Sequence, residues 1–459
     1  MAGAAERWEV SADGLVWTFH LRPSAAWSDG TPLTADDFVY GFHRAVDPAT
    51  ACPSVAALLP ILNAGEISSG REKDLSKLGM TALDPQTLRI TLARPTPWLL
   101  DLLTDQTAMP VPRQAIEKWG DRWTQPEHMV TNGPFTLKKW VPLDEIDLMR
   151  NPHFHDAAAV KIDEVDDVLA DDSSAALKRY ETGELDVIRV PGKEDLPRLK
   201  QERPEELRSD PMLSTSAFVF NMDGPLGADP RIRQALSMVI DREVLENKVA
   251  RRGQIPAYSY IPPGIPNYSM QRPDWADRPM SERIAMAKKL LAEAGTPVPV
   301  KIHLLSPKLD FVQLYTRAII AMWHTALGIE AEEEAMETRI YSGRLTHRDF
   351  EIAFIQWNGS YPDAQDMLSD LGTVGGGYNV GNYRNPKYDS LLDQSSSAAS
   401  PAERTTMLQS AEKLMLQDQP VIPFNFVVAQ RLVNRRVRGI ENSAIGIHPS
   451  RFLSIAEQD

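Results

Sequence analysis

The chain has 459 residues, of which 42% are hydrophobic and 24% are charged. These are ordinary globular proportions and exclude a disordered chain, and the length predicts at least two lobes because a single core stops growing well before this size. The formal net charge of −14 argues against nucleic acid and anionic membrane surfaces as partners. The sequence contains no apolar run long enough to span a bilayer. Cys52 is the only cysteine, which excludes an intramolecular disulfide and a four-cysteine zinc site.

The first part of the chain is predicted to be rich in β-strands. Residues 16–21 and 88–92 alternate between apolar and polar side chains, as strands with one buried face do. Between them, Thr34 can cap a helix whose first turn is acidic. Pro110 and Pro112 then interrupt the pattern and mark a boundary.

From residue 113 onward, helical and strand patterns alternate. Ser281 is expected to cap one of the helices, and glycines at 183, 295 and 328 are expected to end three of them. Helices are predicted at 173–181, 282–294 and 310–326, and strands at 185–188, 215–220, 300–305 and 350–357. The serine-rich residues 395–400 are predicted to link two helices. This alternation predicts an α/β fold with largely parallel sheets.

Motifs for catalysis or metal binding are weak. His153 and His155 form a close histidine pair, but they lie in a polar loop, and an ordinary solvated loop is the simpler interpretation. Acidic residues at 163–167 are typical of the polar edge of a strand. The glycine-rich segment 375–382 lacks the spacing that cradles phosphate and is predicted to be a surface loop. We therefore predict no catalytic residue, no metal and no cofactor.

One group of residues suits a small ligand. The strand 350–357 leads into a segment that combines aromatic, small and acidic residues, and loops beyond strand ends in α/β sheets commonly bind ligands. The candidate ligand-binding residues are Trp357, Asn358, Gly359, Ser360, Tyr361 and Asp363. An alternative stays open in which Trp357 belongs to the core and Asp363 forms a turn after Pro362.

The order of several segments resembles a known family. They include VWTFHLR at 16–22, WSDGTPLT at 27–34, VTNGP at 130–134, YETGELD at 180–186, DPRIRQAL at 229–236 and AKKLLAEAG at 287–295. Each is weak alone, but their colinear order is similar to that of the bacterial extracellular solute-binding proteins of family 5, the periplasmic oligopeptide-binding proteins of ABC importers. The resemblance runs from about residue 5 to about residue 435.

This resemblance implies a two-lobed periplasmic-binding-protein fold of type II, the Venus-flytrap arrangement, with an extra inserted subdomain. The implied divisions are an inserted subdomain at 1–112, lobe I at 113–213 with 432–459, and lobe II at 214–431. The implied function is non-enzymatic capture of oligopeptides between two lobes and their delivery to a membrane permease. The protein is expected to be a periplasmic monomer that binds no nucleic acid.

Two departures from the family pattern shape the expectations. A signal peptide and the strand that would precede Ala5 are not in the sequence, so the N-terminal part of lobe I is expected to be missing.

The second departure concerns the residue that binds the peptide's ammonium group. Oligopeptide-binding proteins carry an aspartate for this group three residues after the tryptophan, where this chain has Ser360. Either Asp363 replaces it, or the ligand is a murein or modified peptide, an opine, a glycan or a metallophore. Arg344 and Arg348 are candidates to bind a carboxylate of the ligand, but the sequence does not place either of them in the cleft. A periplasmic sensor or chaperone is a further alternative.

Overall fold

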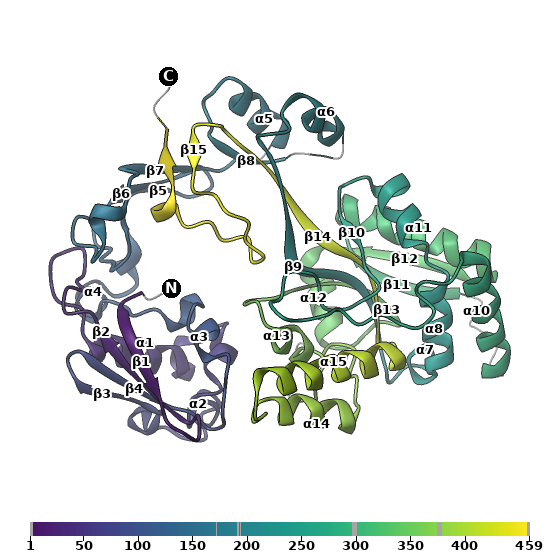
Figure 1. Cartoon of the computed structure of the whole chain (residues 1–459), viewed down its shortest axis with the longest axis horizontal. Coiled ribbons are helices and arrows are strands. Elements are labelled where there is room, and N and C mark those ends of the chain that lie inside the picture. The colour runs from purple at the N-terminus through teal and green to yellow at the C-terminus, as the bar shows by residue number, and fades with distance from the viewer. Residues whose placement is uncertain are drawn as a thin grey trace. The chain divides into compact units, whose positions relative to one another are not determined.

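A computed structural model describes residues 3–456 except 171, 191, 193, 296–300 and 374–378. The chain divides into two compact units. Unit 1 comprises residues 1–188, 433–441 and 448–459, and unit 2 comprises residues 189–432 and 442–447. Figure 1 labels the elements of both. Val300 and residues 375–378 of the predicted glycine-rich loop lie outside the described residues.

Unit 1 contains an antiparallel sheet in the order β1-β2-β4-β3. Its strands are β1 (Ala5–Val10), β2 (Val16–Leu21), β3 (Met80–Asp84) and β4 (Thr87–Thr91). The alternation predicted for β2 is present, because Trp17, Phe19 and Leu21 are buried while their neighbours are partly exposed. Helix α1 (Ala35–Val46) contacts β3 and β4 and begins after Thr34, as predicted.

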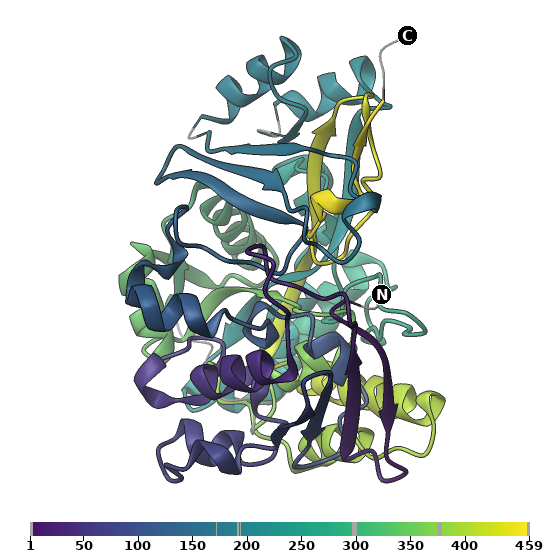
Figure 2. The same cartoon turned by 90° about the vertical axis from the view of Figure 1, so that its left-hand side faces the viewer.

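The rest of unit 1 is a second antiparallel sheet with short helices. Strands β5 (Phe135–Val141), β6 (Glu145–Arg150) and β7 (Glu164–Val168) lie side by side (Figures 1 and 2). A ribbon of β15 (Val437–Arg438) and β16 (Ser454–Ile455) also belongs to this unit. Its helices are α2 (Ala64–Ser68), α3 (Leu99–Leu102), α4 (Arg113–Trp119) and α5 (Ser173–Glu181). Strand β8 (Val187–Arg189) then leads the chain into unit 2.

Unit 2 is built on one mixed sheet in the order β10-β14-β9-β13-β11-β12. The strands are β9 (Leu207–Phe220), β10 (Ile255–Pro256), β11 (Lys301–Pro307), β12 (Glu330–Met336), β13 (Ile352–Asn358) and β14 (Val421–Val433). Strand β8 also pairs with β14. Among the other described strand pairs of the two units, only β11–β12 and β11–β13 are parallel. The expectation of largely parallel sheets is therefore wrong, because the long strands β9 and β14 pair antiparallel with each other and β9 with β13.

Helices cover both faces of the sheet in unit 2. Alternate residues of β9 enter different cores: Phe218 and Phe220 face the cluster under α8, α10 and α11, whereas Ala217 and Val219 face the cluster under α13, α14 and α15. The helices are α6 (Asp195–Glu202), α7 (Pro225–Ala228), α8 (Pro230–Met238), α9 (Arg242–Val244), α10 (Met280–Ala294), α11 (Asp310–Leu327), α12 (Thr338–Thr346), α13 (Ala364–Ser369), α14 (Pro386–Ser395) and α15 (Pro401–Asp418).

Several element boundaries differ from the predictions; strand β9, for example, begins at Leu207 and not at residue 215. Helix α10 begins at Met280 directly after Pro279, so Ser281 lies inside its first turn and does not cap it. Strand β13 begins at Ile352 and continues through Asn358, so Asn358 belongs to the strand and not to the loop beyond it. The predicted ends at Gly295 and Gly328 are confirmed, since both glycines have the positive φ of a left-handed helix cap.

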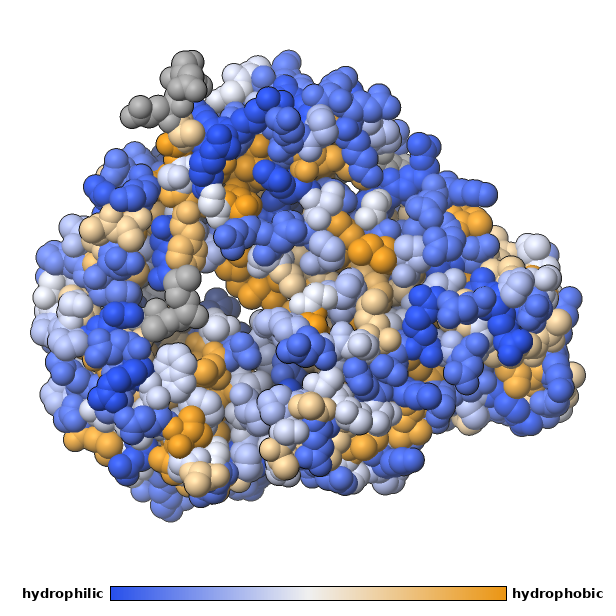
Figure 3. Space-filling model, in the orientation of Figure 1, coloured by the Kyte–Doolittle hydropathy of each residue, from blue (hydrophilic) through white to orange (hydrophobic). Residues whose placement is uncertain are grey.

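Hydrophilic residues dominate the visible surface in Figure 3, as expected for a chain of net charge −14. Within the described residues, none of the helices has the length and apolar character needed to cross a bilayer.

Candidate ligand-binding site

The last residues of β13 point alternately to the two faces of the unit 2 sheet. Trp357 shares the face of Ala353 and lies in the core under α13, α14 and α15, where its side chain is only 4% exposed. Its indole packs edge-on against Tyr260, with ring centroids 5.3 Å apart. The indole Nε1 has no hydrogen-bond partner among the described residues. The structure thus places Trp357 inside unit 2.

Gln356 and Asn358 point to the other face and line a cavity of about 440 Å³ within unit 2. The Asn358 Oδ1 atom accepts hydrogen bonds from the Ser214 hydroxyl at 2.7 Å and from the Gln356 amide at 3.2 Å. Other parts of the wall are apolar and come from the side chains of Val190, Leu196, Met212, Val427 and Val428. Amide and hydroxyl groups beside apolar surface suit a small organic ligand with hydrogen-bonding groups.

Three arginines also line this cavity: Arg189, Arg252 and Arg431. Arg431 pairs with Asp210, whose side chain is almost fully buried, with an Nε–Oδ2 distance of 3.3 Å. Burial lowers the pKa of Arg431, Asp210 raises it, and the positive charge of Arg189 lowers it again. The cavity therefore combines neutral polar groups with a concentration of positive charge.

The loop after β13 is held tightly against the sheet. The Gly359 N–H donates to the Leu213 carbonyl at 2.6 Å. A Cβ atom at Gly359 would lie 3.1 Å from the Leu213 Cβ and 3.3 Å from an Asp366 oxygen, so only glycine fits without displacement. The Ser360 N–H donates to the Asp366 carboxylate. Tyr361 is buried, and burial raises the pKa of its phenol.

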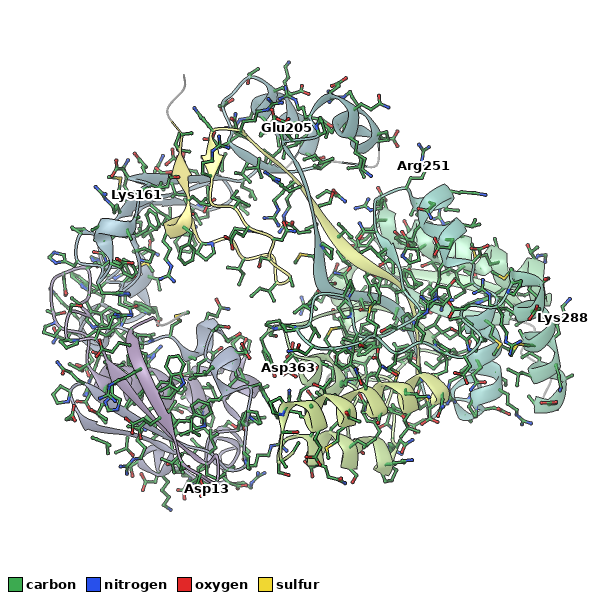
Figure 4. All side chains as sticks on the ribbon, viewed as in Figure 1. Asp13, Lys161, Glu205, Arg251, Lys288 and Asp363 are labelled. Carbon is green, nitrogen blue, oxygen red and sulfur yellow. The ribbon has the colours of Figure 1, made fainter. Side chains whose placement is uncertain are left out.

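Asp363 is committed to contacts within unit 2. Its Oδ1 accepts a hydrogen bond from the Gln365 N–H at 2.8 Å and so caps the N-terminus of α13. Both carboxylate oxygens also accept from the Arg404 guanidinium of α15, at 2.7 and 2.9 Å. Figure 4 labels Asp363 at this point of the fold. This carboxylate is already neutralised by a protein cation.

Two other acidic residues of this region were not singled out from the sequence. Asp366 and Asp370 are four residues apart, which places them on one side of α13 and its end. Burial raises the pKa of Asp366 to about 6, although backbone hydrogen bonds from Ser360 and Tyr361 lower it. Burial and the charge of Asp366 raise the pKa of Asp370 to about 8. The four-residue spacing was visible in the sequence, but the contact with Ser360 was not.

Arg344 and Arg348 lie away from the cavity at the end of β13. They line a different cavity of about 420 Å³ in unit 2. There the guanidinium of Arg344 is paired with the carboxylates of Glu334 and Asp349. Across the described residues, no cluster of three or more histidine, cysteine or acidic side chains could hold a metal ion, and His153 and His155 are not part of one.

The sequence is similar to those of several binding proteins. A family model described as bacterial extracellular solute-binding proteins, family 5, matches residues 1–379. The chain is 36% identical over 439 residues to a probable deoxycholate-binding periplasmic protein of Escherichia coli. It is 36% identical over 443 residues to the periplasmic oligopeptide-binding protein of Salmonella typhimurium. Each alignment covers 95% of this chain and 81% of the relative.

Solved structures agree with this likeness. The Escherichia coli murein tripeptide-binding protein matches 99% of this chain and 90% of its own, with a TM-score of 0.86 and 32% identity. The oligopeptide-binding protein of Burkholderia pseudomallei matches 100% of this chain and 90% of its own, with a TM-score of 0.85 and 31% identity. These matches confirm the α/β, two-lobed periplasmic-binding-protein fold expected from the sequence. The chain belongs to the bacterial extracellular solute-binding proteins of family 5.

Proposed function

We propose that this protein is the ligand-capturing component of an ABC importer, which binds an oligopeptide and delivers it to a membrane permease. It acts in the periplasm and performs no chemistry on its ligand. The observation that carries the proposal is the cavity at the end of β13, where Gln356, Asn358 and Ser214 offer amide and hydroxyl groups beside apolar walls. Such groups match the alternating donors and acceptors of a peptide main chain. Relatives at 35–36% identity are named as oligopeptide-binding proteins, which supports the same ligand class.

In this proposal the carboxylate of Asp366 binds the N-terminal ammonium group of the peptide. Ser360 cannot neutralise a buried cation, and Asp363 is occupied by Arg404. Asp366 lies beside the loop that contains Ser360, as shown by the hydrogen bond that its carboxylate accepts from the Ser360 N–H. Asp366 does not itself line the cavity, so in this proposal the ammonium group lies at the loop beside the cavity, where Asp366 contacts the Ser360 N–H and takes the place of the missing aspartate.

Thermal unfolding with defined ligands tests this function. A ligand that binds only the folded state stabilises it by about 2.7 kcal/mol at a hundredfold excess over Kd. We expect dipeptides to pentapeptides to raise the Tm and to be recovered intact afterwards. Cleaved peptides would contradict a purely binding role, and unchanged Tm values with every peptide would contradict the ligand class.

A second ligand class is favoured by one relative and by the charge of the cavity. The probable deoxycholate-binding protein shares 36% identity with this chain, and the arginines at the cavity suit a carboxylate on an apolar body. In this alternative the transport role is unchanged and the ligand is an amphipathic carboxylate. Deoxycholate would then raise the Tm in the same assay while peptides would not.

A further inference from the structure

The charges around the cavity at the end of β13 are not balanced. Arginines 189, 252 and 431 line it, and no aspartate or glutamate of the described chain does. The carboxylate of Asp210, which does not line the cavity, pairs with Arg431 and neutralises it. Two positive charges, on Arg189 and Arg252, therefore remain at the cavity of a protein whose net charge is −14.

Arg252 forms no ion pair with a described residue, although its charge acts on the nearby Glu246. Its guanidinium lies 5.4 Å from the ring centroid of Phe311, which holds the side chain in place through a cation–π contact. A nearby acid, Glu246, is buried and accepts hydrogen bonds from Asn425 and Tyr315. Burial raises the pKa of Glu246 to about 7, while the hydrogen bonds from Asn425 and Tyr315 and the charge of Arg252 lower it.

Arg189 adds its charge from another part of the chain. It is exposed at the end of β8, close enough to Arg431 to lower the pKa of that guanidinium. Neither Arg189 nor Arg252 forms an ion pair with a described residue. Like charges at one cavity repel each other, and a bound anion removes that repulsion. Guanidinium groups also bind carboxylates with two parallel hydrogen bonds.

We infer that the cavity is a subsite for a carboxylate of the ligand, bound by Arg189 and Arg252. The inference rests on the proposed function only in taking this cavity as the place where the ligand binds. It makes the protein selective for acidic ligands: peptides whose glutamate, aspartate or terminal carboxylate reaches the two arginines, in preference to neutral peptides of the same shape. Gln356 and Asn358 then hold the adjoining amides.

Two tripeptides of nearly equal size test the selectivity. Ala-Glu-Ala with a free C-terminus carries two carboxylates, and the C-terminal amide of Ala-Gln-Ala carries none. Calorimetry should show at least tenfold tighter binding of the acidic peptide by the unaltered protein. In the double variant Arg189→Gln, Arg252→Gln the preference should fall to within about twofold, and the salt dependence of binding should weaken with it.

Arg251 provides the matched control. It neighbours Arg252 in sequence but is exposed and does not line the cavity, and Figure 4 shows its side chain projecting outward. Arg251→Gln removes one positive charge from the same region and should keep the tenfold preference. Loss of the preference in this control would assign the effect to overall charge and would overturn the subsite.

The outcomes separate this inference from the proposed function. Equal affinity of the unaltered protein for both peptides overturns the carboxylate subsite and leaves peptide binding intact. Binding of deoxycholate but of neither peptide, with a loss of affinity in the double variant, supports the subsite and overturns the peptide ligand. If the double variant does not fold, Arg189→Lys and Arg252→Lys singly should each reduce the preference, because lysine keeps the charge and loses the paired hydrogen bonds.

Discussion

The carboxylate of Asp363 accepts two hydrogen bonds from the guanidinium of Arg404, at 2.7 and 2.9 Å. Their side chains are 16% and 15% exposed, so this contact is largely shielded from water. It joins the start of α13 to α15. The Asp363 carboxylate therefore stabilises the fold of unit 2.

Replacing Asp363 should therefore affect stability more than binding. Asp363→Asn should lower the free energy of unfolding by about 1–3 kcal/mol, because it breaks a shielded ion pair and weakens the helix cap. Peptide affinity should stay within about twofold. Glu117→Gln, which breaks the exposed pair with Arg113, should cost less than ~0.5 kcal/mol. Denaturant titration and calorimetry measure both quantities, and a large loss of affinity at unchanged stability would make Asp363 a ligand residue.

Trp357 should behave as a core residue. Trp357→Ala should lower the free energy of unfolding by about 3–5 kcal/mol, because it empties the space beside Tyr260. Trp357→Phe should cost less, since the indole Nε1 makes no hydrogen bond to a described residue. Trp140→Ala, at a side chain 44% exposed, is the control and should cost under ~1 kcal/mol. Weakened ligand binding by Trp357→Phe at native stability would instead place the tryptophan against the ligand.

Glu412 should be among the most sensitive positions of unit 2. Its fully buried carboxylate accepts hydrogen bonds from Tyr260 N, Ile261 N and Tyr268 OH, at 3.0, 2.8 and 2.9 Å. The amide of Glu412→Gln would face some of these donors with its own N–H groups. We expect a loss of ~3 kcal/mol or more in urea unfolding. The neighbouring change Lys413→Gln should have little effect, and equal costs at the two positions would contradict this role.

Asp366 should control the response to a free amine. Asp366→Asn should weaken binding of a peptide with a free N-terminus by about 1–3 kcal/mol, and should leave its N-acetylated form nearly unchanged. Calorimetry with both forms makes the comparison. Ser360→Asp, added to Asp366→Asn, should restore part of the lost affinity because it returns a carboxylate to the same loop. Equal losses for the free and acetylated peptides would exclude Asp366 as the amine partner.

The raised pKa of Asp370 predicts how stability changes with pH. The folded protein holds this proton up to a pKa of about 8, whereas the unfolded chain releases it near pH ~4. Between these two pH values the folded state binds more protons than the unfolded chain. The contribution of Asp370 to stability is therefore full below pH ~4 and is lost as the pH rises through about 8. Asp370→Asn should raise stability at pH 8 by about 1–3 kcal/mol and flatten this dependence. Unfolding curves from pH 5 to 9 test it, with exposed Asp277→Asn as the control.

Much of the local structure was predictable because its causes are local. Helix α5 spans the predicted residues, and Gly295 and Gly328 end their helices with a positive φ. Strand β2 shows the predicted alternation. The family, too, could be recognised from the order of short segments.

The sequence by itself determined these elements and identified residues 357–363 as the segment of interest. Tertiary structure alone decided what each residue of that stretch does. Strand pairing sends Trp357 into the core and turns Asn358 toward Ser214, 144 positions away in sequence. The same packing pairs Asp363 with Arg404 and brings Arg189 and Arg252 to one cavity. Such contacts depend on which strands and helices meet, and no pattern within one segment contains that information.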